Sequence, residues 1–159
     1  MTAAFIGLGA NLGEPRRQLE LALSELDQLP QSKVVRQSSF YRSVPLGNPD
    51  QPEYVNAVAQ LETDLAPERL LAGLHAIENA HGRRRSFPNA PRTLDLDLLM
   101  VGGLRIDGPA LQLPHPRMHE RAFVLIPLLE IEPQAVVPGR GPAKELLARC
   151  ADQGVEKVA

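Results

Sequence analysis

The hydrophobic positions along the chain switch between short apolar runs and the three- and four-residue spacing of a helix. Residues 3–8 form the first apolar run, which predicts a buried strand. The stretch "GANLGEP" then turns the chain and places Pro15 near the first position of a helix, where a missing N–H costs nothing. This helix ends before Pro30, and its predicted apolar face consists of Leu19, Ala22, Leu23 and Leu26.

Two further strands and a second helix follow. Residues 33–41 alternate loosely between apolar and polar positions and predict a strand, and "YVNAVAQLE" (54–62) predicts the next. The proline-rich segment between them is long for a hairpin, and loops of that length usually carry function. Pro67 begins the second helix, which we expect to end at Gly82 and to use Leu70, Leu71, Leu74, Ile77 and Glu78 on one face.

The last predicted strand is "TLDLDLLM" (93–100), which ends at the turn 102–103. Two shorter helices are predicted over residues 121–131 and 142–150. The order is therefore β-α-β-β-α-β with a C-terminal extension. It predicts an α+β fold, a ferredoxin-like sandwich with an antiparallel sheet and helices packed on one sheet face. We expect residues 1–159 to form a single domain.

The strand 93–100 carries an unusual pair of acidic residues. Strict alternation gives it one apolar face, made of Leu94, Leu96, Leu98 and Met100. The other face changes from polar to apolar along the sequence Thr93, Asp95, Asp97, Leu99 and Val101. The first half of this second face should line a pocket and the second half should join the core. Two carboxylates about 6.6 Å apart repel unless a cation lies between them, and oxygen-only ligands favour Mg²⁺. A solvated sheet face is the alternative that the strand alone leaves open.

Charge and composition restrict the function classes. The net charge of -2 offers no general attraction for nucleic acid or a membrane surface, so neither partner is expected. The single cysteine, Cys150, cannot form an internal disulfide and favours the cytoplasm. No apolar run approaches the roughly 20 residues that span a bilayer, and no signal-peptide pattern begins the chain.

Basic residues nevertheless gather on both sides of the acidic strand. The preceding segment contains Arg83, Arg84, Arg85 and Arg92, and the later stretch "LPHPRMHER" contains His115, Arg117, His119 and Arg121. Guanidinium groups match phosphate oxygens, so the pattern favours a site for a polyphosphate and its metal. Arg84 fits a solvated charge at a helix end better than a ligand contact. His75 and His81 lie on the second helix and are expected to be structural or exposed.

Several other sites are not supported by the sequence. "GLGANLG" follows a strand, but its third glycine, Gly13, comes one position too late for a dinucleotide fingerprint, and no Walker motif occurs. No Cys/His cluster suits zinc.

Three long stretches together carry a resemblance to a known family. "SSFYRSVPLGNPDQPEYVNA", "APRTLDLDLLM" and "LPHPRMHERAFVLIPL" resemble the 6-hydroxymethyl-7,8-dihydropterin pyrophosphokinases of folate biosynthesis, from "GLGANLG" to about residue 133. The resemblance implies transfer of the pyrophosphoryl group of ATP to the hydroxymethyl oxygen of the pterin, with release of AMP, on a ferredoxin-like monomer.

The resemblance also implies roles for individual residues. Asp95 and Asp97 match ligands of two Mg²⁺ ions, and Arg83, Arg92, His115 and Arg121 match triphosphate contacts. We add Arg85 to the ATP contacts, and we expect Arg83, Arg92, Asp95 and Asp97 to carry catalysis. The pterin positions are Tyr54, Phe123 and Asn56, together with a loop containing Ser43, Val44 and Leu46. Tyr54 also fits an ordinary core aromatic.

The chain departs from the family pattern in the segment 82–91, which we expect to act as a lid. Some members carry a Lys near position 86 and a Trp soon after, whereas this chain has Ser86, Phe87 and Asn89. Pro116 stands where some members place Tyr. Two alternatives remain from other classes: a non-catalytic ferredoxin-like small-molecule-binding module and an RNA-binding sheet. The first has no need for a carboxylate pair facing clustered arginines, and the second needs exposed aromatics on central strands and a basic surface, of which this chain offers little.

Overall fold

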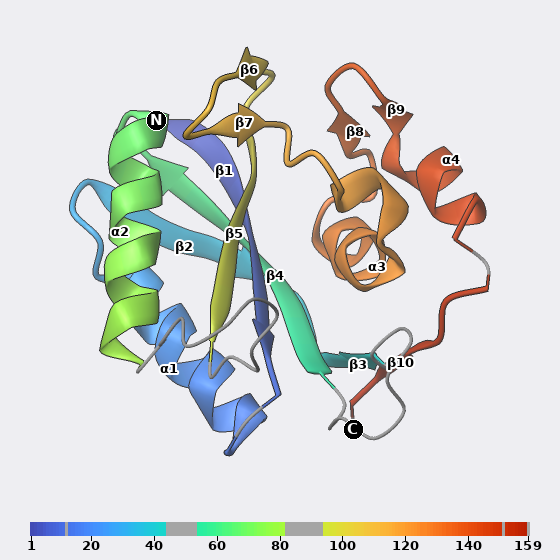
Figure 1. Cartoon of the computed structure of the whole chain (residues 1–159), viewed down its shortest axis with the longest axis horizontal. Helices are drawn as coiled ribbons and strands as arrows, with labels where there is room; N and C mark the ends of the chain where they lie inside the picture. Colours follow the sequence, from blue (N-terminus) through green and yellow to red (C-terminus); the bar gives the residue numbers. More distant parts are fainter. Residues whose placement is uncertain (12, 44–53, 82–93, 151, 159) are drawn as a thin grey trace.

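An antiparallel sheet forms the centre of the computed structural model (Figure 1). The structure describes residues 1–11, 13–43, 54–81, 94–150 and 152–158. Within these residues the sheet has six strands, in the order β10-β3-β4-β1-β5 with β2 also paired to β4. Their bounds are β1 (Thr2–Ala10), β2 (Ser32–Gln37), β3 (Tyr41–Ser43), β4 (Tyr54–Thr63), β5 (Asp95–Val101) and β10 (Val155–Lys157).

Helices cover both faces of this sheet (Figure 1). On one face lie α1 (Pro15–Asp27) and α2 (Pro67–Ala80), each with proline in its first turn as predicted. On the other face lies α3 (Ala122–Ile131), followed by α4 (Ala143–Ala148). The two helices of the predicted β-α-β-β-α-β order thus lie on one sheet face as expected, and the C-terminal extension, for which no face was predicted, supplies the helices on the other. The sequence "AFVLIPLLEI" is apolar nearly all round, which suits a helix enclosed between a sheet and a neighbouring helix.

Short elements complete the C-terminal half. The hairpins are β6 (Ile106–Asp107) with β7 (Gln112–Leu113), and β8 (Val136–Val137) with β9 (Gly141–Pro142). A single 3-10 turn covers Met118–Glu120 and leads directly into α3. No helix in the described part of the chain is long and apolar enough to cross a membrane.

The predicted second strand is divided into two. β2 ends at Gln37 and β3 begins at Tyr41, with Ser38 buried between them. Ser38 donates its backbone N–H to the carbonyl of Val58 at 2.9 Å, and its Oγ accepts from the N–H of Val58 at 2.9 Å. The Ser38 side chain therefore replaces a backbone carbonyl as the acceptor for Val58, which allows the strand to be interrupted at this point.

A β-bulge in β5 reverses the predicted alternation. Phe5 pairs with Met100 and Ile6 pairs with Leu98, so Leu99 has no partner on β1. Leu99 and Met100 both pack in the core beneath α3, whereas Val101 packs in the core beneath α1 and α2. The predicted faces of Met100 and Val101 were thus wrong. Side chains alternate between the two sheet faces, so one extra residue in the strand moves every later side chain to the opposite face. The faces of Leu94, Leu96 and Leu98 follow the prediction.

Candidate active site

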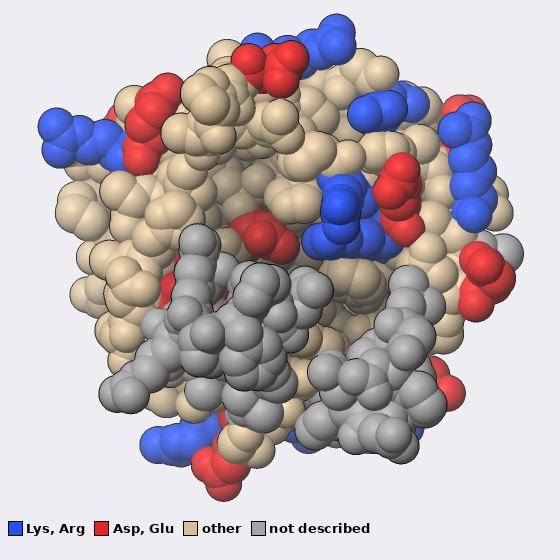
Figure 2. Space-filling model, viewed as in Figure 1, with Lys and Arg blue, Asp and Glu red and all other residues tan. Residues whose placement is uncertain are grey.

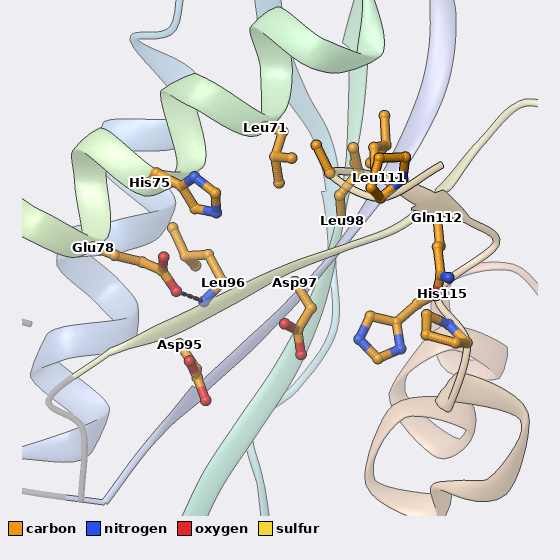
Figure 3. A pocket seen from close by; sticks show the side chains of 13 residues that line it. Leu71, His75, Glu78, Asp95, Leu96, Asp97, Leu98, Leu111, Gln112 and His115 are labelled. Carbon is orange, nitrogen blue, oxygen red and sulfur yellow. Dashed lines mark hydrogen bonds between the residues drawn. The ribbon is translucent and has the colours of Figure 1, made fainter. Parts of the chain in front are cut away.

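A cavity of about 380 Å³ lies between α2, the first half of β5 and the loop that follows β6 (Figure 3). Helix α2 contributes Leu71, His75 and Glu78, which are spaced so that they share one helix face. The remaining lining comes from residues 95–98, 109–112 and 115–116. One part of this lining is apolar and the other is acidic, which suits a ligand with a flat apolar end and a charged end. Figure 2 shows the hollow on this face, with acidic side chains inside it and basic side chains beside it.

Asp95 and Asp97 lie where the sequence predicted them, half-buried on the open half of β5 (Figure 3). Their neighbours across the ladder are Gly9 and Gly7, which have no side chains to cover the carboxylates. Arg121 approaches from the start of α3, with its Nη1 3.9 Å from Oδ2 of Asp97. The described residues contain no group of three side chains that could hold a metal ion by themselves.

Glu78 is a site residue whose place the sequence left unrecognised. Its side chain is 1% exposed, and its Oε2 accepts a 2.8 Å hydrogen bond from the backbone N–H of Leu96. Leu96 lies between the two aspartates, so this bond holds the backbone that carries both of them (Figure 3). The available signal was a Glu among the apolar positions of α2, because a buried carboxylate requires a partner.

One hydrogen bond holds the backbone of His115 against β5, and a second, within its own loop, orients its ring. Its N–H donates to the carbonyl of Leu99, the bulged residue, at 2.8 Å, and its Nδ1 accepts from the N–H of Arg117 at 3.1 Å. When Nδ1 accepts, the proton of a neutral imidazole is on Nε2, which is then free to donate to an anion. The ring faces Asp97 across the cavity (Figure 3).

Burial is the largest influence on the charge of this imidazole. Burial lowers the pKa of His115, Asp97 raises it, and Arg121 and Arg117 lower it again, so that the net pKa lies below the ordinary value of 6.5. His115 is therefore neutral at pH 7 in the absence of a ligand.

Three further predicted residues, Ser43, Tyr54 and Asn56, meet where β4 begins. The amide Nδ2 of buried Asn56 donates to the Oγ of buried Ser43 at 2.7 Å, across the pairing of β3 with β4. Tyr54 is half-buried and pairs with Ser43 on the same ladder. Phe123, in the first turn of α3, is partly buried, and the Arg121 guanidinium lies 5.5 Å from its ring centroid. Arg121 thus links the aromatic group to Asp97.

His75 of α2 and His81, which follows the last residue of that helix, differ from each other. His75 is exposed and also lines the cavity, a position that the sequence did not indicate. His81 hydrogen-bonds Gln18 and Glu25 of α1 through its two ring nitrogens, which agrees with the structural role expected for it. The predicted residues Arg83, Arg85, Arg92, Val44 and Leu46, and the expected lid 82–91, lie outside the described residues.

Comparison with known proteins decides the family. A family profile described as 7,8-dihydro-6-hydroxymethylpterin-pyrophosphokinase (HPPK) matches residues 5–133. The chain belongs to the HPPK family. Proteins named 2-amino-4-hydroxy-6-hydroxymethyldihydropteridine pyrophosphokinase are 46% identical to it in Pseudomonas aeruginosa, over 97% of this chain and 95% of theirs, and in Haemophilus influenzae, over 99% of both. In Bacillus subtilis such a protein is 41% identical over 80% of this chain and 77% of its own.

Solved HPPK structures share the fold. An HPPK-DHPS structure in complex with substrates matches 95% of this chain with a TM-score of 0.75 and 11% identity. The Plasmodium falciparum HPPK-DHPS structure with pteroate matches 93% with a TM-score of 0.73 and 13% identity. This chain spans less than half of those chains, 43% and 42%. The prediction of an HPPK-type pyrophosphokinase is confirmed by the family match, and these comparisons do not favour the non-catalytic module.

Proposed function

We propose that this chain transfers the pyrophosphoryl group of ATP to the hydroxymethyl oxygen of 6-hydroxymethyl-7,8-dihydropterin, as a step of folate biosynthesis. The observation that carries the proposal is the half-buried pair Asp95 and Asp97, which faces His115 and Arg121 at the mouth of a partly apolar cavity. The family to which the chain belongs supports the same reaction.

ATP would occupy the cavity between α2 and β5. Its adenine fits the apolar part, near Leu71, Leu98 and Leu111, and its phosphates fit the acidic part. Neutral His115 would donate its Nε2 proton to a phosphate oxygen, and Arg121 would provide a guanidinium beside the same group. We keep Arg83, Arg85 and Arg92 as further triphosphate contacts and Arg83 and Arg92 as catalytic residues.

Two Mg²⁺ ions are part of the proposal, and the donor chemistry of the site fits them. Mg²⁺ typically takes one or two carboxylates and fills its shell with water and substrate phosphates. Asp95 and Asp97 are such a pair, and the described residues supply no third side chain that would enclose the metal. When bound, the ions would neutralise charge on the transferred phosphoryl group.

The pterin would bind where β4 begins. Asn56 and Ser43 form a buried polar pair that fits the edge of a heterocycle with donors and acceptors, and Phe123 offers a ring for stacking. Tyr54 remains at the border of this pocket, and the backbone of Val44 and Leu46 completes the proposed contacts. Arg121 contacts both Phe123 and Asp97, so the two substrates would meet beside it.

The chemistry proceeds by direct displacement. The hydroxymethyl oxygen attacks the β-phosphorus while the bond from that phosphorus to the oxygen shared with the α-phosphate breaks. AMP leaves with the shared oxygen, and the hydroxyl proton passes to water. Positioning of two bound substrates and stabilisation of charge carry most of such a reaction.

The finer features of the fold are also proposed. The strand order β5-β1-β4, with β2 and β3 together on the far side of β4, supports a ferredoxin-like core in which one edge strand is divided. We propose that residues 1–159 form one domain, because the two cores lie on opposite faces of the same sheet. A monomer in the cytoplasm remains our proposal, and the single free thiol of Cys150 is compatible with a reducing compartment.

The reaction is tested by incubating the protein with Mg²⁺, ATP and 6-hydroxymethyl-7,8-dihydropterin and separating the nucleotides. We expect AMP in equal amount to a pyrophosphorylated pterin, and no product after removal of Mg²⁺ with EDTA. Formation of ADP would instead indicate a simple kinase, and binding of ATP without turnover would contradict the proposed catalysis.

A further inference from the structure

A carboxylate at the far end of α3 collects hydrogen bonds from the segment that joins β2 to β3. The two carboxylate oxygens of Glu130 accept the backbone N–H of Ser39 at 3.1 and 3.0 Å, and Oε2 also accepts the Ser39 hydroxyl at 2.9 Å. The phenol of Tyr41 donates to Oε1 of the same carboxylate. One side chain of the helix therefore holds both Ser39, just before β3, and Tyr41, the first residue of β3.

This anchor matters because β3 is only three residues long. It pairs with β4 on one side, but its neighbour on the other side, β10, is equally short, so few ladder bonds fix its position. Tyr41 pairs with Asn56 and Ser43 pairs with Tyr54, so any shift of β3 changes the contact between Ser43 and Asn56. Tyr41 is 7% exposed, and its phenol would lose its partner if Glu130 were removed.

The other end of α3 carries the aromatic residue proposed for pterin stacking. Phe123 lies in the first turn of this ten-residue helix, whereas Glu130 lies in its last turn. The helix thus contacts both sides of the proposed pterin pocket: it supplies the ring at one end and holds the Ser43 strand at the other. A rigid helix sets the distance between them.

We propose that Glu130 is a positioning residue for the pterin substrate, which through Ser39 and Tyr41 holds β3 in register so that Ser43 and Asn56 lie correctly opposite Phe123. The inference rests on the proposed function, because it presumes that the pterin binds at Ser43, Asn56 and Phe123. The hydrogen bonds of Glu130 go to Ser39 and Tyr41 rather than to any of these three residues.

The protonation states suit this arrangement. Burial raises the pKa of Glu130. The hydrogen bonds from Tyr41 and Ser39 and the nearby charge of Lys157 lower it by more, so the net pKa is below its ordinary value. Burial and the neighbouring carboxylate raise the pKa of Tyr41. At neutral pH the carboxylate is therefore an acceptor and the phenol a donor.

Two variants test the role. Glu130→Gln keeps the size of the side chain but replaces one acceptor oxygen with a donor, and Tyr41→Phe removes a single hydrogen bond without changing the ring. Glu132→Gln is the matched control, since Glu132 adjoins the same helix end and its hydrogen bond in the described residues is a weak one to the N–H of Gln134. Each protein is titrated with the pterin in the presence of Mg²⁺ and the α,β-methylene analogue of ATP, and separately with that analogue alone.

We expect Glu130→Gln to raise the Kd for the pterin by about fivefold or more and Tyr41→Phe by a smaller factor, with the Kd for the nucleotide analogue within about twofold of wild type. Glu132→Gln should match wild type for both ligands. A purely structural role would lower the folded fraction and leave both dissociation constants unchanged. If Glu130→Gln does not fold, the same comparison is made with Tyr41→Phe, which removes only a hydroxyl group and leaves the ring packed in the core.

Two results overturn the inference. The first is a folded variant with an unchanged pterin Kd, and the second is an equal rise of both dissociation constants. Failure of the wild-type protein to bind the pterin or to form AMP would instead overturn the proposed function, and the inference with it. Because wild type is measured first, the two failures are distinguishable.

Discussion

The backbone N–H of Leu96 donates a 2.8 Å hydrogen bond to the buried carboxylate of Glu78. This contact joins α2 to the one peptide segment that carries both Asp95 and Asp97 on the cavity side of β5. An edge strand has no further strand to hold its outer backbone groups, so a side chain from the covering helix takes that place.

The first prediction concerns this bond. Glu78→Ala leaves the N–H of Leu96 without its acceptor and should lower the free energy of unfolding by about 1–3 kcal/mol. It should also weaken Mg²⁺-dependent ATP binding, because the two aspartates lose their common support. Glu78→Gln keeps a carbonyl acceptor and should lose less of both. Urea denaturation and ATP titration measure the two effects, and equal losses in the Ala and Gln variants would argue against the backbone role.

The second prediction concerns the carboxylate pair. Asp97→Asn keeps the shape of the side chain but removes its charge, and we expect Mg²⁺-dependent ATP binding to fall by more than the roughly 10–100-fold typical of a lost supporting contact. Asp107→Asn is the control, since Asp107 is an exposed carboxylate on β6. Isothermal titration with Mg²⁺ and the α,β-methylene analogue measures the change. Equal affinities in the two variants would remove Asp97 from the metal site.

The third prediction concerns Gly9, which lies between Asn56 and Asp95 across the sheet. A Cβ at this position would lie 3.1 Å from Oδ1 of Asn56, and Asn56 is held in place by its bond to Ser43. Gly9→Ala should therefore displace the Asn56 amide and raise the KM for the pterin several-fold, with a smaller effect on the KM for ATP. At Gly103 a Cβ would meet nothing within 4 Å, so Gly103→Ala is the matched control. Steady-state kinetics with each substrate varied in turn measure both KM values. Wild-type KM values for the pterin in Gly9→Ala as well as in Gly103→Ala would refute the prediction.

The fourth prediction concerns Cys150, which is 5% exposed and whose thiol contacts the carbonyl of Leu146. Burial, followed by the charges of Asp152 and Glu120, raises the pKa of this thiol. Since the thiolate is the reactive species, the folded protein should react with Ellman's reagent at pH 8 about a hundredfold more slowly than the protein unfolded in guanidinium chloride. Immediate reaction of the folded protein would contradict the burial.

The fifth prediction follows from the lowered pKa of Glu130. A carboxylate with a folded pKa below its ordinary value of 4.5 stabilises the protein above that pH, and the contribution is lost as the pH falls through the folded value. The difference in free energy of unfolding between wild type and Glu130→Gln should therefore be constant from pH 7 to about 5 and should shrink below that range. Urea denaturation at stepped pH measures it. A difference that grows on acidification would show that the carboxylate is not stabilised by its hydrogen bonds.

The regular elements were largely accessible from local pattern. The prolines at positions 15 and 67 marked two helix starts, and the apolar spacing of each helix identified its core face. The half-polar face of β5 correctly indicated an open site at Asp95 and Asp97 that becomes core at Leu99. These features depend on neighbours within a few residues, so the sequence contains them directly.

The errors and omissions share a different origin. The bulge at Leu99, the break at Ser38 and the placement of α3 on the second sheet face each depend on a partner far along the chain. β10 was not predicted at all, because its three residues become a strand only by pairing with β3. Strand identity for such short segments comes from long-range hydrogen bonds rather than from propensity.

The chemistry of the site divides in the same way. By itself the sequence determined which residue types are present, where they occur along the chain and, through motifs of matched spacing, which family they belong to. Only the tertiary structure decided that Glu78 holds Leu96, that His75 lines the cavity and that Glu130 holds the strand of Ser43. A hydrogen bond between residues 18 or 91 positions apart leaves no periodic trace, since its existence depends on how two separately formed elements pack against each other.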